Sequence, residues 1–339
     1  MNIAPTGQAL GEKGDRLSII IPTYNCAHYL EETLLSLKQQ PEGSLDRAQI
    51  LVVDDHSTKD DPKSVVDRIW GGRVKFFRHE KNVGPCANFN ACLDLAERDW
   101  IHMLHGDDYV FAGAYEEFNQ CLEAVPDAIA VFARSVVIND AGRWGACSWP
   151  LGDEWRGRFV YKPEMWANSP VPFPGVLIGR RAIDLVGKFD CSFCHAQDCN
   201  LWWRMAKTGK VAYSNRCVAA YRESESNHTS SLLRTGKNLS EDLDQTERVL
   251  ASMKEDGSYS DEQILRLYEI PFEKTLKQCY KYIEQPEAFA ANIQMFRRFP
   301  SPLRRHRRVL MSRLRHFRLM VRRRLGSSAP QVTAPPRFD

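Results

Sequence analysis

The chain has 339 residues, of which 43% are hydrophobic and 26% are charged. These proportions exclude a largely disordered chain and a collagen-like fibre. No stretch approaches the roughly 18 to 20 uninterrupted apolar residues that a membrane-spanning helix needs. The first twenty residues lack the apolar stretch of a signal peptide, because the charged segment 12–16 precedes the first apolar run. We therefore expect a cytoplasmic protein whose ten cysteines are all free thiols.

The formal net charge of +3 hides a strong asymmetry along the chain. Residues 297–324 contain twelve arginines and no acidic residue. The rest of the chain therefore carries a formal charge of −9, since the whole carries +3. This distribution indicates one local anionic partner near the C-terminus rather than a protein that is basic all over.

In chain order, short apolar runs alternate with segments of helical periodicity. The run LSIII at 17–21 ends at Pro22 and is typical of a buried strand. Further strands are expected at 50–53, 74–77, 101–104 and 128–138, and helices at 30–37 and 85–97. This rhythm predicts an α/β fold with a Rossmann-like, mostly parallel sheet flanked by helices.

The second half of the chain is predicted to become helical. Residues 139–175 are rich in Trp, Gly and Pro, so we expect an irregular segment that could cover a cleft. Short strands are expected at 176–178 and 211–212, with a helix at 197–207 between them. Three more helices are expected at 239–255, 260–283 and 286–297, and the last residues have a disordered composition.

The first candidate site motif is VVDDHS at 52–57, where Asp54 and Asp55 follow a predicted strand. Open parallel sheets bind ligands at the carboxyl ends of their strands. A carboxylate there can accept hydrogen bonds from a base N–H or a ribose hydroxyl. The alternative is a structural role, in which Ser57 or Asp60 caps a helix.

The second motif is LHGDD at 104–108, again directly after a predicted strand. Asp107 and Asp108 beside the flexible Gly106 suit Mg²⁺ or Mn²⁺ bound to phosphate oxygens, because hard cations prefer oxygen ligands. The alternative is a turn with a capping aspartate.

Together with SIIIPTYN at 18–25, NVG at 82–84 and NFN at 88–90, these two motifs resemble a family 2 glycosyltransferase with the GT-A fold. The resemblance covers about residues 16–225. It implies a nucleotide-diphospho-sugar donor, a divalent metal, Mn²⁺ or Mg²⁺, and inversion at the anomeric carbon. Carried over residue by residue, it implies a donor site formed by Pro22, Thr23, Tyr24, Asn25, Asp54, Asp55, Asn82, Gly84, Asn88, His105, Gly106 and Arg222.

The same resemblance implies roles for the acids. Asp107 matches the last acid of the family's metal-binding Asp-x-Asp, and His105 replaces the first, as in a His-x-Asp-Asp subset of the family. Asp107 is then the principal metal ligand, with Asp108 beside it. Asp198 matches the family's general base, although Gln197 replaces the usual Glu. One carboxylate there would take the proton of the attacking hydroxyl. The alternative is that Asp198 only caps the following helix.

Two further segments leave alternatives open. The sequence CSFCH at 191–195 matches a haem-attachment pattern and, with Cys199, hints at zinc. We instead expect free cysteines in an acceptor loop, because no export signal and no second Cys-x-x-Cys pair exists. The segment Tyr221-Arg222 through His228 is similar to the family's Arg-x-His but has extra residues. Arg222 would there reach the diphosphate and His228 the metal. His228 could equally be a surface residue.

The basic segment 303–325 carries an apolar stripe at Leu310, Leu314, Phe317 and Val321. An arginine-rich amphipathic helix is typical of one lying on an anionic membrane. Nucleic-acid binding and packing on the protein are the alternatives, and no specific nucleic acid is expected because no RNA-binding aromatic signature accompanies the charge.

The resulting hypothesis is an inverting, metal-dependent glycosyltransferase on the inner face of the membrane, which acts on a saccharide or lipid-linked acceptor. A nucleotidyltransferase would want a Gly-rich basic loop after the first strand, and residues 22–25 do not provide one. A non-catalytic sugar-nucleotide or nucleic-acid binding protein is the remaining rival. The expected layout is a flexible tail at 1–15, a GT-A domain at 16–235, a helical region at 236–325 and a disordered tail at 326–339.

Overall fold

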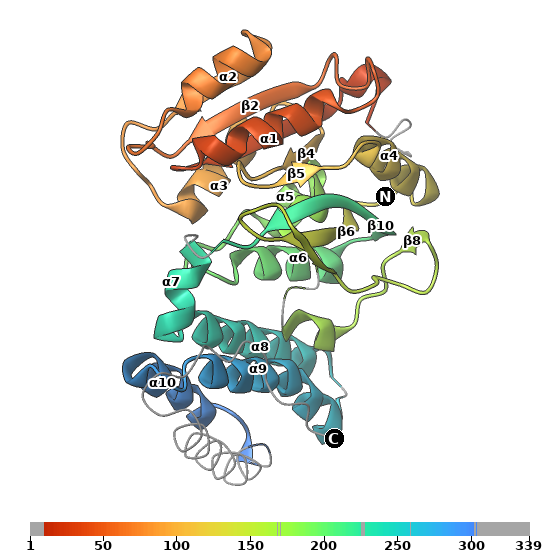
Figure 1. Cartoon of the computed structure of the whole chain (residues 1–339). Helices are drawn as coiled ribbons and strands as arrows, with labels where there is room; N and C mark the ends of the chain where they lie inside the picture. Colours follow the sequence, from red (N-terminus) through yellow and green to blue (C-terminus); the bar gives the residue numbers. More distant parts are fainter. Residues whose placement is uncertain are drawn as a thin grey trace. The chain divides into compact units, whose positions relative to one another are not determined.

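The structure is a computed structural model that describes residues 10–167, 169, 171–224, 228–257, 259–301 and 303. The chain divides into two compact units. The first comprises residues 1–161 and 169–225, and the second comprises residues 162–168 and 226–339. Figure 1 shows the elements of both. The predicted membrane helix at 303–325 lies almost wholly outside the described residues.

The first unit is built on one sheet in the order β3-β2-β1-β4-β9-β6-β10-β5. The first four strands of this order are parallel, as predicted. The rest is mixed, because β9 runs antiparallel between β4 and β6, while β10 is parallel to β6. The strands are β1 (Leu17–Thr23), β2 (Gln49–Asp54), β3 (Lys75–Arg78), β4 (Trp100–Met103), β5 (Tyr109–Val110), β6 (Ala130–Ile138), β7 (Trp144–Cys147), β8 (Arg156–Arg158), β9 (Val176–Gly179) and β10 (Val211–Arg222).

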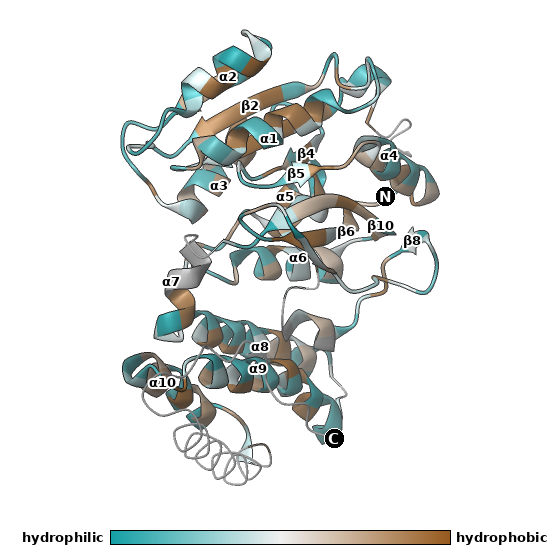
Figure 2. Cartoon of the chain, viewed as in Figure 1, coloured by the Kyte–Doolittle hydropathy of each residue, from teal (hydrophilic) through white to brown (hydrophobic). Residues whose placement is uncertain are grey.

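Apolar side chains fix the helices of this unit against the sheet. Leu17, Ile19 and Ile21 alternate along β1 and join one buried cluster with Leu30 and Leu34 of α1. Figure 2 shows the hydrophobic residues concentrated along β2 and β6. The helices are η1 (Glu12–Gly14), α1 (Ala27–Lys38), α2 (Pro62–Trp70), α3 (Pro85–Leu95), α4 (Ala114–Ala124), η3 (Phe173–Gly175), α5 (Arg180–Val186) and α6 (Gln197–Thr208). The predicted α/β fold with flanking helices is confirmed.

The segment 139–175 is more regular than predicted. β7 pairs antiparallel with β6, and β8 pairs antiparallel with β10. The turn before β7 is set by Asn139, whose Oδ1 accepts hydrogen bonds from the backbone N–H groups of Ala141 and Arg143. Gly142 takes the positive φ of 70° that this turn needs. The Gly- and Trp-rich start of this segment is therefore a β-hairpin formed by β6 and β7. β10 is also longer than the strand predicted at 211–212, since it continues to Arg222.

The second unit is helical, as the sequence predicts. Its elements are η2 (Pro163–Ala167), α7 (His228–Thr235), α8 (Lys237–Asp256), α9 (Asp261–Lys281), α10 (Pro286–Ile293) and η4 (Gln294–Arg297). A capping box between Ser260 and Gln263 starts α9. Phe296 and Phe299 are buried and meet the ring of Phe272 edge-on. No described helix is long and apolar enough to cross a membrane.

The prediction that all ten cysteines are free thiols is wrong. Cys86, in the first turn of α3, forms a disulfide with Cys191, which lies 105 residues later. The other eight cysteines form no disulfide. No local pattern predicts this pair, because the two residues meet only when the segment before α6 packs beside α3.

Candidate active site

The carboxyl ends of β1, β2 and β4 lie at one edge of the sheet, since the three strands are parallel neighbours. Backbone hydrogen bonds tie the loops that follow them. The N–H of Asp55 donates to the carbonyl of Thr23 at 2.9 Å, and that of Gly106 donates to Pro22 at 3.0 Å. The three predicted motifs are therefore brought together at the edge where open sheets bind ligands.

Asp54 and Asp55 are both buried and engage neighbouring loops. Asp54 accepts a hydrogen bond from the hydroxyl of Ser57 at 2.5 Å and pairs with Nε of Arg78 at the same distance. Asp55 accepts from the backbone N–H groups of Val83 at 2.7 Å and Gly84 at 3.0 Å. These contacts shape the edge of the site, and direct nucleotide contact by either acid stays a prediction.

The loop after β1 is held by Asn25, which has a φ of +51°. Asparagine tolerates this left-handed conformation better than most residues. Its side-chain carbonyl accepts from the backbone N–H groups of Thr58 and Lys59, so it joins the β1 and β2 loops. Tyr24, beside it, is 48% exposed, which leaves its ring available to a ligand.

The remaining predicted donor-site residues also lie around this edge. A Cβ on Gly106 would lie 3.0 Å from Oγ1 of Thr23, so any other residue there would push the β1 and β4 loops slightly apart. Gly84 has a φ of +85° and precedes α3. Asn82 donates to the carbonyl of Asp55 at 3.1 Å, and Oδ1 of Asn88 lies 3.1 Å from Nε2 of His79.

The loop after β4 gathers His105, Asp107 and Asp108, whose potential ligand atoms all lie within 4.8 Å of one another. Asp108 is 1% exposed, and its Oδ1 accepts the backbone N–H of Arg222 at 2.8 Å. Its Oδ2 accepts no hydrogen bond from a described residue, and Nδ1 of His105 lies 4.0 Å away. An unpaired carboxylate oxygen inside a protein is costly unless a cation or donor arrives.

Burial shifts the proton equilibria of all three groups. It raises the pKa of Asp107 to about 6 and raises that of Asp108 well above its usual range, with the charge of Asp107 adding to the effect. Burial lowers the pKa of His105 to about 4, so its imidazole is neutral at pH 7. Two carboxylates and a neutral imidazole fit Mn²⁺ or Mg²⁺, because the ion's charge would relieve the repulsion between the acids.

Arg222 has a buried guanidinium that serves the fold around these acids. Its Nε donates to the carbonyl of Asp107 at 2.9 Å, and its Nη2 pairs with Glu32. The guanidinium also lies 4.3 Å from the ring centre of Tyr29. These contacts favour a positioning role for Arg222, and its predicted contact with the diphosphate stays a prediction.

Asp198 lies in the first turn of α6, where its Oδ1 accepts the N–H of Cys199 at 2.7 Å. It is half-buried. Burial raises the pKa of Tyr221 strongly, and the charges of Asp108, Asp198 and Asp107 raise it further. The phenol of Tyr221 is therefore within electrostatic reach of both the acid cluster and the predicted base. Tyr221 begins the segment that resembles the family's Arg-x-His, but no role was predicted for its side chain. The side chain of His228 lies outside the described residues.

An aromatic wall backs the acid cluster and was not predicted. The ring of His105 stacks on Phe89 at 4.9 Å and meets Phe173 at 4.2 Å. Phe189 and Trp202 pack behind Phe173. Their spacing in the sequence, between residues 89 and 202, carries no local signal.

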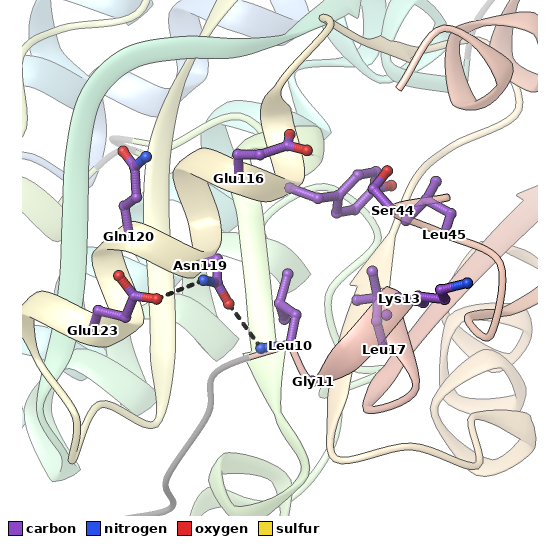
Figure 3. A pocket seen from close by; sticks show the side chains of 12 residues that line it. Leu10, Gly11, Lys13, Leu17, Ser44, Leu45, Glu116, Asn119, Gln120 and Glu123 are labelled. Carbon is purple, nitrogen blue, oxygen red and sulfur yellow. Dashed lines mark hydrogen bonds between the residues drawn. The ribbon is translucent and has the colours of Figure 1, made fainter. Parts of the chain in front are cut away.

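A separate cavity of about 360 Å³ lies between α4 and the segment around Leu10 (Figure 3). Asn119 bridges it, because its Oδ1 accepts the N–H of Leu10 at 3.1 Å and its Nδ2 donates to Glu123 at 2.8 Å. None of the predicted site residues lines this cavity. The cavity is therefore separate from the strand-end site.

Comparison with solved structures defines the class of fold. S. aureus TarS in complex with UDP-GlcNAc aligns with a TM-score of 0.56 and 18% identity, over 85% of this chain and 82% of that one. The mannosyltransferase PcManGT from Pyrobaculum calidifontis, in complex with GDP-Man and Mn²⁺, aligns with a TM-score of 0.51 and 17% identity, over 90% and 83% of the two chains. The fold is that of the GT-A glycosyltransferases.

Sequence comparison gives the family. The pattern of glycosyl transferase family 2 matches residues 18–185. A β-1,3-glucosyltransferase of Campylobacter jejuni that acts on GalNAc(5)-diNAcBac-PP-undecaprenol is 35% identical over 31% of this chain and 34% of its own. Abequosyltransferase RfbV of Salmonella typhimurium is 36% identical over 28% of each chain. An uncharacterized protein of Mycobacterium tuberculosis is 25% identical over 66% of this chain and 72% of its own.

The chain carries the sequence pattern of glycosyl transferase family 2 over residues 18–185. It spans only about a third of the length of the two relatives with named activities. The matched pattern ends before Asp198, so it includes the predicted donor-site residues up to Asp108 but neither the predicted base nor Arg222.

Proposed function

We propose that the protein is an inverting, metal-dependent glycosyltransferase that uses a nucleotide-diphospho-sugar. The observation that carries this proposal is the cluster of His105, Asp107 and Asp108 at the strand ends, with the charge of Asp198 reaching the same phenol of Tyr221. A pair of acids that can hold a metal ion and a further carboxylate that can take a proton are what transfer from a diphosphate requires.

In this proposal the loops after β1, β2 and β4 bind the nucleotide, and Asp107 and Asp108 hold the metal. When bound, the ion offsets the charge that grows on the departing diphosphate. Asp198 takes the proton from the acceptor hydroxyl, which attacks the anomeric carbon from the opposite face. The charges of the metal-binding acids and of Asp198 all act on the phenol of Tyr221. The buried Arg222 donates a hydrogen bond to the carbonyl of Asp107 and so holds its loop in place.

The donor is supported by the bound nucleotides of the structural neighbours, UDP-GlcNAc in TarS and GDP-Man with Mn²⁺ in PcManGT. Because these two differ in base and sugar, they support the class of donor and not one compound. The undecaprenol-linked substrate named for the Campylobacter relative supports a lipid-linked acceptor. The ten arginines at 303–325 would then hold the enzyme on the anionic surface that carries this acceptor.

The rival is a protein that binds sugar nucleotides without turning them over. The two are separated by release of nucleoside diphosphate from a panel of UDP- and GDP-sugars in the presence of Mn²⁺. Chelator-sensitive release from one donor supports the proposal. Saturable binding without release supports the rival.

A further inference from the structure

We propose that His105 is a direct metal ligand and that its ring nitrogen makes the site select a transition-metal ion, such as Mn²⁺ or Co²⁺, over Mg²⁺. This inference rests on the proposed metal-dependent function and deepens it by naming the ion class. The sequence instead suggests His228 as the histidine that binds the metal, and it places His105 among the donor-site residues.

The geometry around the His105 ring supports direct ligation. Phe89 stacks on the ring with planes 18° apart, and Phe173 lies 4.2 Å away, so these rings pack against the imidazole. No described residue forms a hydrogen bond with Nε2, although that atom is buried. Nδ1 lies 4.0 Å from Oδ2 of Asp108, which is buried and equally without a hydrogen-bond partner. The imidazole of His105 and the unpaired Oδ2 of Asp108 therefore lie close enough for one cation to contact both, within the 4.8 Å cluster that also includes Asp107.

His102 provides an internal comparison, because it lies three residues earlier and is also buried. Its Nδ1 lies 3.0 Å from the hydroxyl of Tyr115, and its Nε2 lies 3.1 Å from the carbonyl of Pro174. Both nitrogens of His102 are thus satisfied, as expected of a structural histidine. His105 differs from His102, because its buried Nε2 has no hydrogen-bond partner among the described residues and its Nδ1 faces a carboxylate.

The identity of the ligand decides which ion is preferred. Carboxylate and water oxygens suit Mg²⁺, whereas an imidazole favours transition metals, with affinity rising from Mn²⁺ to Co²⁺. If His105 occupies the place of a carboxylate, the site loses one negative charge and gains a nitrogen donor. Mg²⁺ then loses more affinity than Mn²⁺ or Co²⁺.

The test is pulsed EPR of Mn²⁺ bound to the full-length protein with UDP and, in parallel, with GDP. We expect coupling to a ¹⁴N nucleus that persists in His228→Ala and disappears in His105→Asp. Calorimetry with Co²⁺ and Mg²⁺ should show the Co²⁺/Mg²⁺ affinity ratio falling at least about tenfold in His105→Asp, as for other changes to metal ligation.

The outcomes separate the inference from the proposed function. Bound Mn²⁺ without ¹⁴N coupling overturns the role of His105 and leaves metal-dependent transfer intact. Coupling that disappears in His228→Ala assigns the nitrogen to His228 and overturns the inference even if His105→Asp fails to fold. If no metal binds and chelator does not change donor turnover, both the inference and the metal dependence are wrong. The transferase activity would still stand.

Discussion

Cys86 of α3 is joined by a disulfide to Cys191, in the segment that leads into α6. The bond links α3, which follows the turn at Asn82–Gly84, to the segment that leads into α6, where the predicted base Asp198 lies. A second link lies beside it, since the side chain of Asn90 exchanges hydrogen bonds with the backbone N–H and C=O of Phe189 at 3.0 and 3.1 Å. The disulfide and these hydrogen bonds therefore hold α3 against the segment before α6.

Cys86→Ser should lower the free energy of unfolding. A cross-link between residues 105 positions apart restricts the unfolded chain and stabilises a protein by about 2–4 kcal/mol. Urea unfolding followed by circular dichroism measures the loss, and Cys147→Ser, which removes an exposed free thiol, is the control. An equal, small effect of both substitutions would show that the link contributes nothing to stability.

Asp198→Asn should reduce turnover by roughly 10² to 10⁴ while donor affinity stays nearly unchanged, because the amide keeps the shape but cannot take a proton. The matched control is Asp184→Asn, which alters an exposed carboxylate of α5. Steady-state release of nucleoside diphosphate and calorimetric donor binding give the two readings. Loss of donor binding along with turnover would mark Asp198 as a structural residue.

Asp107→Asn should stabilise the metal-free protein at neutral pH. The pKa of Asp107 is raised to about 6 by burial, against about 3.9 for an unfolded aspartate. The native state therefore binds more protons between these values, so stability falls as pH rises from about 4 to 6 and remains lower above it. We expect a gain of about 1–2 kcal/mol at pH 7.5 for the variant, after allowing for its partial exposure.

The control for this change is Asp153→Asn, at an exposed aspartate. Urea unfolding of the metal-free proteins at pH 5 and 7.5 provides the comparison. The advantage of Asp107→Asn should shrink at pH 5 and reverse when Mn²⁺ and nucleotide are added. If Asp107→Asn is less stable than the wild type at pH 7.5 without metal, the charged carboxylate of Asp107 does not destabilise the folded protein.

Truncation after Phe299 should keep donor hydrolysis and abolish binding to anionic vesicles. Phe299 itself stays, because it is buried against Phe272 and Phe296. Full-length binding should weaken as salt rises, since the Debye length falls to about 3 Å at 1 M. Vesicle co-sedimentation at low and high salt measures both. Equal binding by the truncated chain would refute the membrane hypothesis, and tight RNA binding by the full chain would favour the nucleic-acid alternative.

The parallel strands and the motifs at their ends were predictable from the sequence, because both depend on local patterns. The apolar run at 17–21 forms a strand, and the acids at 54–55 and 107–108 lie at or just after the ends of the strands that were predicted before them. The helices of the second unit were equally visible in their periodicity. Local pattern also explains the recognition of the family from residues before 108.

Contacts between distant segments could not be predicted in the same way. The pairing of Cys86 with Cys191 and the packing of Phe89 on His105 depend on where α3 meets later segments. The motif around Arg222 implies contact with the diphosphate, but it does not predict the contacts that the buried guanidinium makes within the protein. Its burial beneath the Asp107 loop follows from β10 continuing to that residue, ten positions beyond the strand that was predicted.

The most direct test of the account is the rate of nucleoside diphosphate release from a panel of UDP- and GDP-sugars, measured with Mn²⁺ for the wild type and for Asp107→Ala. The account predicts that one donor class is turned over by the wild type, that excess chelator stops the release, and that Asp107→Ala abolishes it. Release that is unaffected by chelator and by Asp107→Ala, or no release from any donor, would contradict it.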